Sequence, residues 1–303
     1  MKSDSEAATH TYLAWGLVIR SAIPLPEATA LANGIPYQAT ILVGTITRDH
    51  EDWKATACFV ETRHSGYLLR VPGIARFRVS NGSEITIEPE LKPDWEAVRL
   101  FLLGPVFAAL LYQRRLLPLH ASAIATNRGG VIFAGGSGVG KSALAAAFNV
   151  NGYEVLADEI CAVDCSSGEG MVRPGIPRLL LWPDVIRQLG LTAQDIRSVR
   201  AGLNKQHVRV HETRGSLRIH AIYVISVRPS GNFGVAAVEG AEKLRALTDI
   251  LHGGRFLSSM TSLPDHFALL TSLARTTPVS KMTRPMVCEL KEVAELLERD
   301  FKK

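Results

Sequence analysis

Cysteine is scarce in this chain, which has 4 cysteines among its 303 residues. So few thiols exclude the disulfide frameworks that hold small secreted domains together. Cys161 and Cys165 lie close together, but no second pair of cysteine or histidine residues follows at the spacing of a zinc site. Free thiols in a reducing compartment are therefore the simplest interpretation, and we expect a cytoplasmic protein.

Long apolar runs are also missing. The most apolar stretch, residues 98–112, contains Arg99 and is interrupted by Gly104 and Pro105. A helix that crosses a bilayer needs about 20 apolar residues, so this stretch predicts a buried helix that bends at the proline. The first residues are polar and acidic, so no signal peptide is indicated and no membrane partner is expected.

The chain also lacks a large excess of charge of one sign. The chain has 34 Lys and Arg against 29 Asp and Glu, a net charge of +5 that is modest for this length. A dense basic face is therefore not indicated, and no nucleic-acid partner is expected. One basic cluster stands out, and it is either a solvated pair of strands or a surface that faces a phosphate or an acceptor. It comprises Lys205, His207, Arg209, His211, Arg214, Arg218 and His220.

The chain does contain a glycine-rich motif between an apolar run and an alanine-rich run. The motif reads G-x-x-x-x-G-K-S and comprises Gly135, Gly136, Ser137, Gly138, Val139, Gly140, Lys141 and Ser142. A strand that turns through glycines into a helix N-terminus directs several backbone N–H groups at one point, which favours phosphate oxygens. Lys141 then reaches the β- and γ-phosphates, and the Ser142 hydroxyl coordinates Mg²⁺. The motif predicts a site for ATP and Mg²⁺, although no base-reading motif distinguishes ATP from GTP.

Three parts follow one another along the chain. Short apolar and alternating runs over residues 1–92 predict a small β-rich N-terminal domain, which includes a hairpin with Asn81 and Gly82 at its turn. Asp94 is the expected N-cap of a connecting helix within residues 93–117. Residues 118–303 carry a strand, the glycine-rich motif with its helix, and another strand, an order that predicts an α/β nucleotide-binding core. The expected helical C-terminal part comprises residues 241–252, 264–275 and 286–301.

Two carboxylates, Asp158 and Glu159, end the apolar run that follows the motif. A P-loop protein holds its metal-side carboxylate at such a position. Since side chains alternate along a strand, the two should point differently, one toward metal or water and the other toward an acceptor. The residues themselves leave open which is which. His120 lies on the preceding strand and would reach Asp158 if the two strands are neighbours; a purely structural histidine is the alternative.

Three segments together resemble the HPr kinase/phosphorylase family. They are L-H-A-S-A around His120, the glycine-rich motif, and L-A-D-E at the end of the strand that follows the motif, residues 156–159. The resemblance covers residues 116–164 and implies a fold similar to that of phosphoenolpyruvate carboxykinase. By matching position, it implies that Asp158 accepts the proton of an acceptor serine, with His120 and Lys141 also catalytic. It implies that Ser142 and Glu159 hold Mg²⁺. The family's L-E-x-R-G-L-G segment has no match in this chain, so neither phosphorolysis nor HPr as acceptor follows.

Other segments are similar to the divergent HPr-kinase-like proteins of peptide-tailoring clusters, such as lasso peptide kinases. These segments are the opening residues 12–26, the strand expected over residues 217–227, and the Pro-Val and Arg-Pro pairs within residues 278–285. The similarity implies a serine-containing peptide or small protein as acceptor. By charge and position alone, Lys205 or Arg209 would bind its carboxylate or growing phosphate. The family also implies a homo-oligomer.

These observations together predict a serine kinase that uses ATP and Mg²⁺ and transfers phosphoryl to a peptide or small protein. Two alternatives from other classes stay open. A nucleotide-gated regulatory or binding module would bind ATP without transferring a phosphoryl group. A carboxykinase-like enzyme would act on a small acid, but only the analogy of fold supports it, and fold does not carry function.

Overall fold

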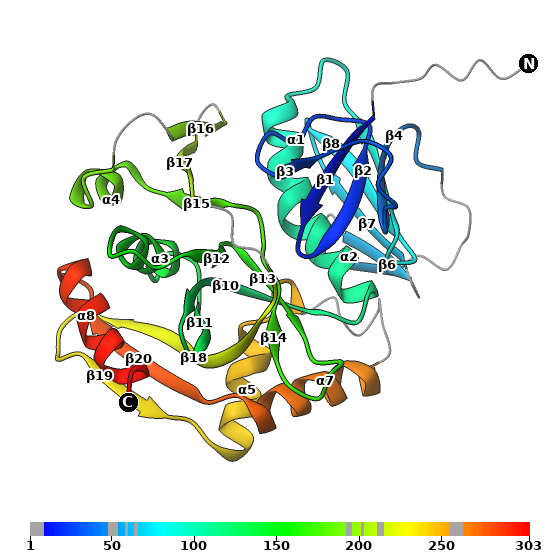
Figure 1. The fold of residues 1–303 in the computed structure, drawn as a ribbon. Coiled ribbons are helices and arrows are strands. Elements are labelled where there is room, and N and C mark those ends of the chain that lie inside the picture. The colour runs from blue at the N-terminus through cyan, green and yellow to red at the C-terminus, as the bar shows by residue number, and fades with distance from the viewer. Residues whose placement is uncertain are drawn as a thin grey trace, which may run out of the picture. The chain divides into compact units, whose positions relative to one another are not determined.

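The computed structural model describes residues 9–47, 54–57, 60–63, 66–191, 196–200, 203–210, 215–254 and 263–303 (Figure 1). Two compact units make up the chain. The first comprises Met1–Arg115 with Arg255–Leu263, and the second comprises Leu116–Gly254 with Pro264–Lys303. Each combines sheets and helices, so the mixed α/β class predicted from the sequence is confirmed.

The first unit is built on one sheet, in which the described strands follow the order β3-β1-β2-β4-β9-β8-β7-β6-β5. The strands are β1 (His10–Ala14), β2 (Leu17–Ser21), β3 (Thr29–Leu31), β4 (Ala39–Val43), β5 (Lys54–Ala57), β6 (Val60–Arg63), β7 (Gly66–Val71), β8 (Ala75–Ser80) and β9 (Glu84–Pro89). The hairpin predicted from the Asn-Gly pair joins β8 to β9, because Asn81 and Gly82 both take positive φ, at 53° and 62°.

A bent helix packs on β8 of this sheet: α1 (Trp95–Phe101), η1 (Leu102–Val106) and α2 (Phe107–Gln113). Asp94 caps it by accepting from the backbone N–H groups of Glu96 and Ala97, at 3.0 and 3.1 Å. Its bend lies at Gly104 and Pro105, where Gly104 leaves helical geometry with φ −113° and ψ −112°. The helix expected to connect two domains therefore lies inside the first unit.

The same helical stretch, residues 95–113, is by length and composition apolar enough to cross a membrane. In this structure 67% of its most apolar 18-residue window is buried inside the protein. Val98, Leu102, Val106 and Leu110 are fully buried, so the stretch serves as the core helix of the first unit.

The second unit has a mixed sheet in the order β11-β10-β13-β14-β18-β20-β19, and β11 also pairs with β18. Its strands are β10 (Leu117–Thr126), β11 (Gly129–Ala134), β13 (Ile160–Asp164), β14 (Met171–Val172), β18 (Leu217–Arg228), β19 (Gly234–Ala237) and β20 (Val279–Pro285), with the short β12 (Val155–Ala157) beside β10. A separate small sheet follows the order β15-β17-β16, with β15 (Arg178–Leu181), β16 (Ile196–Arg200) and β17 (Leu203–Arg209).

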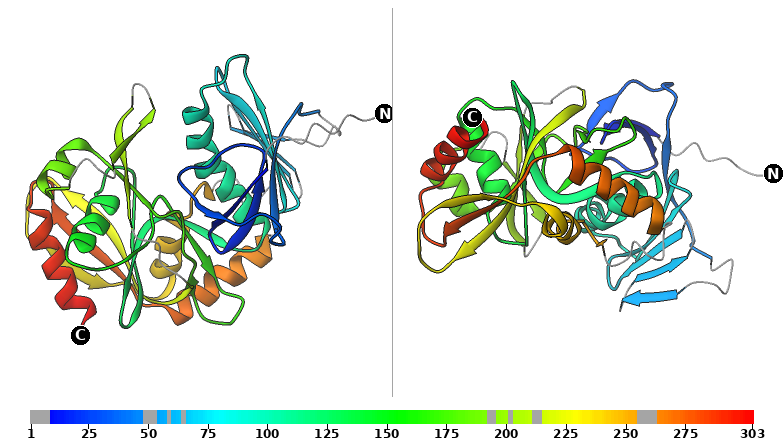
Figure 2. Two further views of the ribbon diagram at one scale, coloured as in Figure 1. Left: turned by 45° about the horizontal axis from the view of Figure 1, so that its top comes forward. Right: turned by 90° about the horizontal axis from the view of Figure 1, so that it is seen from below.

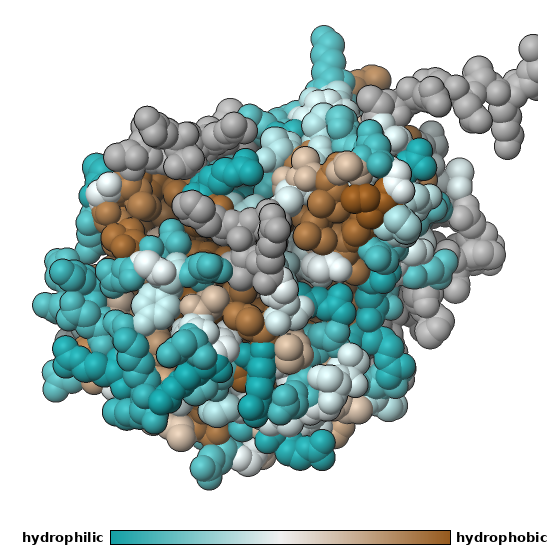
Figure 3. Space-filling model, viewed as in Figure 1, coloured by the Kyte–Doolittle hydropathy of each residue, from teal (hydrophilic) through white to brown (hydrophobic). Residues whose placement is uncertain are grey.

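Helices cover both faces of the larger sheet (Figures 1 and 2). On one face lie α3 (Lys141–Val150) and α8 (Leu290–Phe301), and on the other lie α5 (Gly240–Asp249) and α7 (Leu263–Thr276). The short α4 (Pro183–Gln188) follows β15. α8 is amphipathic: Val293, Leu297 and Phe301 face the core, and Figure 3 shows hydrophilic side chains over its outer surface.

Two of the three helices expected in the C-terminal part are present as α5 and α7, over residues 240–249 and 263–276, but this part of the chain also contains strands. β19 and β20 form an antiparallel pair there, and β20 also pairs in parallel with β18. The last helix accordingly begins at Leu290 rather than at residue 286. The buried residues Val279 and Met282 are three positions apart, so no apolar alternation marks this segment, and its parallel pairing with β18 makes it a strand.

Candidate functional site

The glycine-rich loop joins β11 to α3 at the middle of the larger sheet, where β11 lies between β10 and β18. Gly135, Gly138 and Gly140 take positive φ values of 141°, 81° and 97°. A Cβ at Gly135 would lie 2.9 Å from the carbonyl oxygen of Ile225. Only glycine therefore fits this close turn, which delivers the chain directly into the N-terminus of α3.

Lys141, at the first position of α3, folds back over the loop. Its Nζ donates to the carbonyl oxygens of Gly135 and Gly136, at 3.1 and 2.9 Å. Burial lowers the pKa of this ammonium group, while the nearby charges of Glu159 and Asp158 raise it. The two hydrogen bonds thus hold the ammonium group against the glycine-rich loop that precedes α3.

Asp158 lies directly after β12 and is surrounded by donors. Its Oδ1 accepts from the hydroxyls of Ser122 and Ser142, at 2.5 and 2.8 Å. Its Oδ2 accepts from the backbone N–H of Leu180, at 2.8 Å. Burial raises the pKa of the carboxyl, and the hydrogen bonds from Ser122, Leu180 and Ser142 oppose that shift. β10, β15 and α3 therefore all fix this one side chain.

The chemistry of these donors fits Mg²⁺. Hydroxyl and carboxylate oxygens are ligands that this ion accepts. The Ser142 oxygen, which donates its proton to Asp158 at 2.8 Å, keeps its lone pairs for a cation. Oδ2 of Asp158 has one protein donor and so retains acceptor capacity for a metal-bound water.

Glu159 makes different contacts from Asp158, and both residues lie in a bend after β12 rather than on the strand. Its backbone φ is +67°, an unusual value for a residue with a side chain, and Ile160 donates back to the carbonyl of Asp158 at 2.8 Å. The side chain is 33% exposed and its Oε1 lies 3.6 Å from Nε2 of His120. Asp158 and Glu159 are both half-buried, but three protein donors hold the Asp158 carboxylate, whereas Glu159 meets the ring of His120.

His120 and His252 lie together beside Glu159. Their rings meet edge to face with centroids 5.6 Å apart. Backbone hydrogen bonds hold both residues: His120 donates to Ile250 at 2.8 Å, and His252 donates to Pro118 at 2.9 Å. Burial, with the charges of Lys141 and His252, lowers the pKa of His120 to about 4. His120 is therefore neutral at pH 7, and its contact with Glu159 is a polar contact rather than a charged pair.

The partner of Asp158 from β10 differs from the expected one. Ser122, rather than His120, makes the hydrogen bond to its carboxylate. His120 influences Asp158 only through space, because its own nearest carboxylate is Glu159. The sequence reasoning missed Ser122, which carries no catalytic motif; its place two residues from His120 on the same strand face is a signal that could have found it.

Lys205, on β17, lies close enough to the loop for its charge to act there. Its positive charge lowers the pKa values of both Lys141 and His120. Its Nζ stands over the ring of Trp182, 5.7 Å from the ring centroid, a cation–π contact. Arg209 lies four residues further along β17, where it is exposed and paired in register with Arg178.

The described members of the basic cluster lie on strands of two different sheets. Those at positions 205, 207 and 209 lie on β17 of the small sheet, whereas Arg218 and His220 lie on β18 of the larger one. Arg218 pairs with Glu169 at 3.3 Å. His211 and Arg214 lie outside the described residues. Of the described cluster members, Lys205 is the one whose charge acts on both Lys141 and His120.

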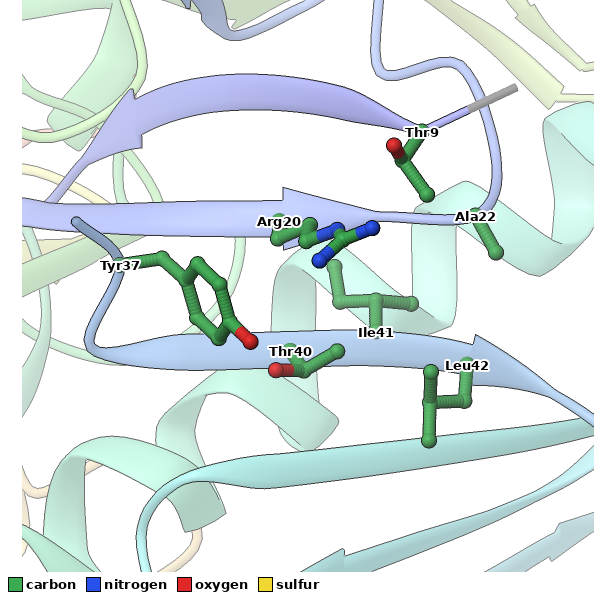
Figure 4. Close-up of a pocket in the computed structure, with 7 residues that line it drawn as sticks. All are labelled: Thr9, Arg20, Ala22, Tyr37, Thr40, Ile41 and Leu42. Atoms are coloured by element: carbon green, nitrogen blue, oxygen red, sulfur yellow. The ribbon is translucent and has the colours of Figure 1, made fainter. Parts of the chain in front are cut away.

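A pocket of about 290 Å³ lies in the first unit, over β2 and β4 (Figure 4). The guanidinium of Arg20 stands over the Tyr37 ring, 5.7 Å from its centroid. The pocket is lined by Thr9, Arg20, Ala22, Tyr37, Thr40, Ile41 and Leu42. Among these lining residues there is one cation and neither a carboxylate nor an imidazole.

No protein-family model and no curated protein matches the chain. Among solved structures, the HPr(Ser) kinase/phosphatase from Coxiella burnetii is similar to it. The two chains share 15% identity, and the similarity covers 61% of this chain and 95% of that one, with a TM-score of 0.33.

Proposed function

We propose that the second unit binds ATP with Mg²⁺ and transfers the γ-phosphoryl group to a serine hydroxyl of a peptide or small protein. The observation that carries the proposal is the Ser142–Asp158 hydrogen bond beneath the glycine-rich loop, at 2.8 Å. A hydroxyl at the start of the P-loop helix, held by a carboxylate that follows the next strand, is the arrangement with which P-loop enzymes bind the metal of a nucleotide.

The nucleotide side of the site consists of the loop, Lys141, Ser142 and Asp158. The loop N–H groups and Lys141 hold the phosphates, and Lys141 exchanges its bonds to Gly135 and Gly136 for phosphate oxygens. Ser142 and Asp158 hold the metal. When bound, Mg²⁺ supplies the positive charge that offsets the charge developing on the phosphate oxygens.

The acceptor side consists of Glu159, His120 and Lys205. Glu159 is the group that takes the proton from the acceptor hydroxyl, since its side chain is 33% exposed and Asp158 is enclosed by donors. This assignment exchanges the roles that the family resemblance implies for the two carboxylates. The acceptor oxygen bonds to the γ-phosphorus, the bond from that phosphorus to the bridging oxygen breaks, and ADP leaves with the bridging oxygen.

The acceptor is proposed to be a peptide of the kind that lasso-peptide tailoring enzymes modify, as the sequence resemblance favours. Lys205 is proposed to bind the carboxylate or the growing phosphate of this peptide, because the charge of Lys205 lowers the pKa values of both Lys141 and His120. Arg209, on the same strand, would extend this basic edge further from the loop.

Intact-mass spectrometry tests the proposal directly. Serine-containing peptides and small proteins are incubated with Mg-ATP and the wild-type chain, Lys141→Ala or Glu159→Gln, with a chelator control. A mass gain of one phosphate on one acceptor, lost in both variants and with the chelator, would support transfer. ATP binding without transfer to any acceptor in the pool would favour the nucleotide-gated module instead.

A further inference from the structure

Arg284, from a distant part of the chain, donates hydrogen bonds to the glycine-rich loop. It lies on β20, which pairs in parallel with β18, and β18 pairs in parallel with β11, the strand that leads into the loop. Its Nη2 and Nε both donate to the carbonyl oxygen of Val139, at 2.9 and 3.3 Å. Its Nη1 donates to the carbonyl of Pro285 at 3.0 Å, which anchors the guanidinium to the end of its own strand.

The carbonyl that Arg284 holds belongs to a peptide unit of the phosphate-binding loop. The peptide unit is planar, so fixing the oxygen of Val139 also fixes the direction of the Gly140 N–H on its opposite edge. In a P-loop such N–H groups point at the phosphates. A planar guanidinium that donates twice to one oxygen restricts rotation of this unit more than a single donor would.

Gly140 and Arg284 also fit each other sterically. Gly140 takes φ +97°, and a Cβ there would lie 2.9 Å from Nη2 of Arg284. The absence of a side chain at position 140 is what lets the guanidinium approach the loop this closely. The guanidinium of Arg284 therefore lies against the loop at Gly140.

We propose that Arg284 is a positioning residue for the nucleotide, which holds the peptide between Val139 and Gly140 with its N–H toward the phosphates. The proposal rests on the proposed nucleotide site but goes beyond it, since the sequence motif ends at Ser142. Removal of the guanidinium leaves Lys141, Ser142 and the carboxylates in place. The loss should therefore appear in nucleotide affinity and little in the transfer rate at saturating ATP.

The test is the dissociation constant of Mg-ATP, measured by titration calorimetry on the full chain. Arg284→Ala is expected to raise it about 10-fold or more, in line with the loss of hydrogen bonds from a charged group. Arg284→Lys should give a smaller but clear increase, because an ammonium keeps the charge and loses the planar fork. Arg228→Ala is the matched control: Arg228 ends the neighbouring strand, is exposed, and is in register with Pro285.

Two readouts separate positioning from a general structural role. The KM for ATP should rise in the Arg284 variants while the KM for the acceptor stays unchanged, and the thermal midpoint of Arg284→Lys should stay close to that of the wild type. Equal ATP affinity in wild type and Arg284→Ala would overturn this inference alone. Wild-type ATP affinity in Arg284→Lys would show that the paired hydrogen bonds from the guanidinium to Val139 do not position the loop. A wild-type chain that binds no nucleotide would overturn the proposed function as well.

Discussion

The two sides of the proposed site differ in how firmly the protein holds its functional groups. On the nucleotide side, Lys141 is 7% exposed, and three donors from three elements enclose Asp158. On the acceptor side, the side chains of His120 and Glu159 are 28% and 33% exposed, and Lys205 stands over Trp182, which is itself 44% exposed. Groups that meet an invariant ligand can be preorganised by the fold, whereas groups that meet a peptide stay open until it arrives.

The largest effect is expected from Lys141→Ala, which removes the ammonium group from the nucleotide side. Loss of a buried charged partner of the phosphates costs about 2–5 kcal/mol, so ATP affinity should fall on the order of 10²-fold or more. Fluorescence or calorimetric titration with Mg-ATP measures it. Affinity within a few-fold of the wild type would show that the loop does not bind nucleotide phosphates.

The two carboxylates offer a direct test of which side each serves. Glu159→Gln should lower kcat on the order of 10²-fold, as for loss of a positioned base, and leave ATP affinity unchanged. Asp158→Asn should instead raise the Mg²⁺ concentration needed for half-maximal activity, because the amide weakens the hold on Ser142. Rate measurements over a Mg²⁺ series separate the two effects. The opposite pattern would return the roles to those that the family resemblance implies.

Lys205→Ala sharpens the comparison on the acceptor side. We expect the KM for the acceptor to rise about 10-fold, as for loss of one charge-assisted contact, with the KM for ATP little changed. Arg209→Ala is the matched control on the same strand and should have a smaller effect, because Lys205 is the one of these two cations whose charge lowers the pKa values of Lys141 and His120. Equal increases in the acceptor KM for the two variants would show that Lys205 contributes no more to acceptor binding than Arg209.

The smallest expected effect is a pH dependence of stability from His120. Burial, with the charges of Lys141 and His252, lowers its folded pKa to about 4, whereas an unfolded histidine has a pKa of about 6.5. Between these values the unfolded chain binds the extra proton, so stability rises with pH and is lost as pH falls from about 6.5 toward 4. His120→Gln should reduce this slope by about one proton in chemical denaturation at several pH values. An unchanged slope would mean that His120 titrates normally in the folded protein.

Local features of this chain could be read from the sequence because neighbouring residues determine them. Asp94 caps its helix through N–H groups two and three residues away. The Asn81–Gly82 turn closes a hairpin because both residues accept positive φ. The last strand, β20, could not be read in this way, since its pairing with β18 is set by a segment far away in the chain.

The same distinction holds at the candidate site. The sequence by itself determined the glycine-rich loop, Lys141 and Ser142, and it determined that two carboxylates follow the next strand. Only the tertiary structure decided the partners: Ser122 lies 36 residues from Asp158 along the chain, Leu180 lies 22 residues away, and Arg284 lies 145 residues from Val139. The physical reason is that a motif is specified by the conformational preferences of adjacent residues, whereas burial and hydrogen bonding at the site depend on which strands and helices pack together.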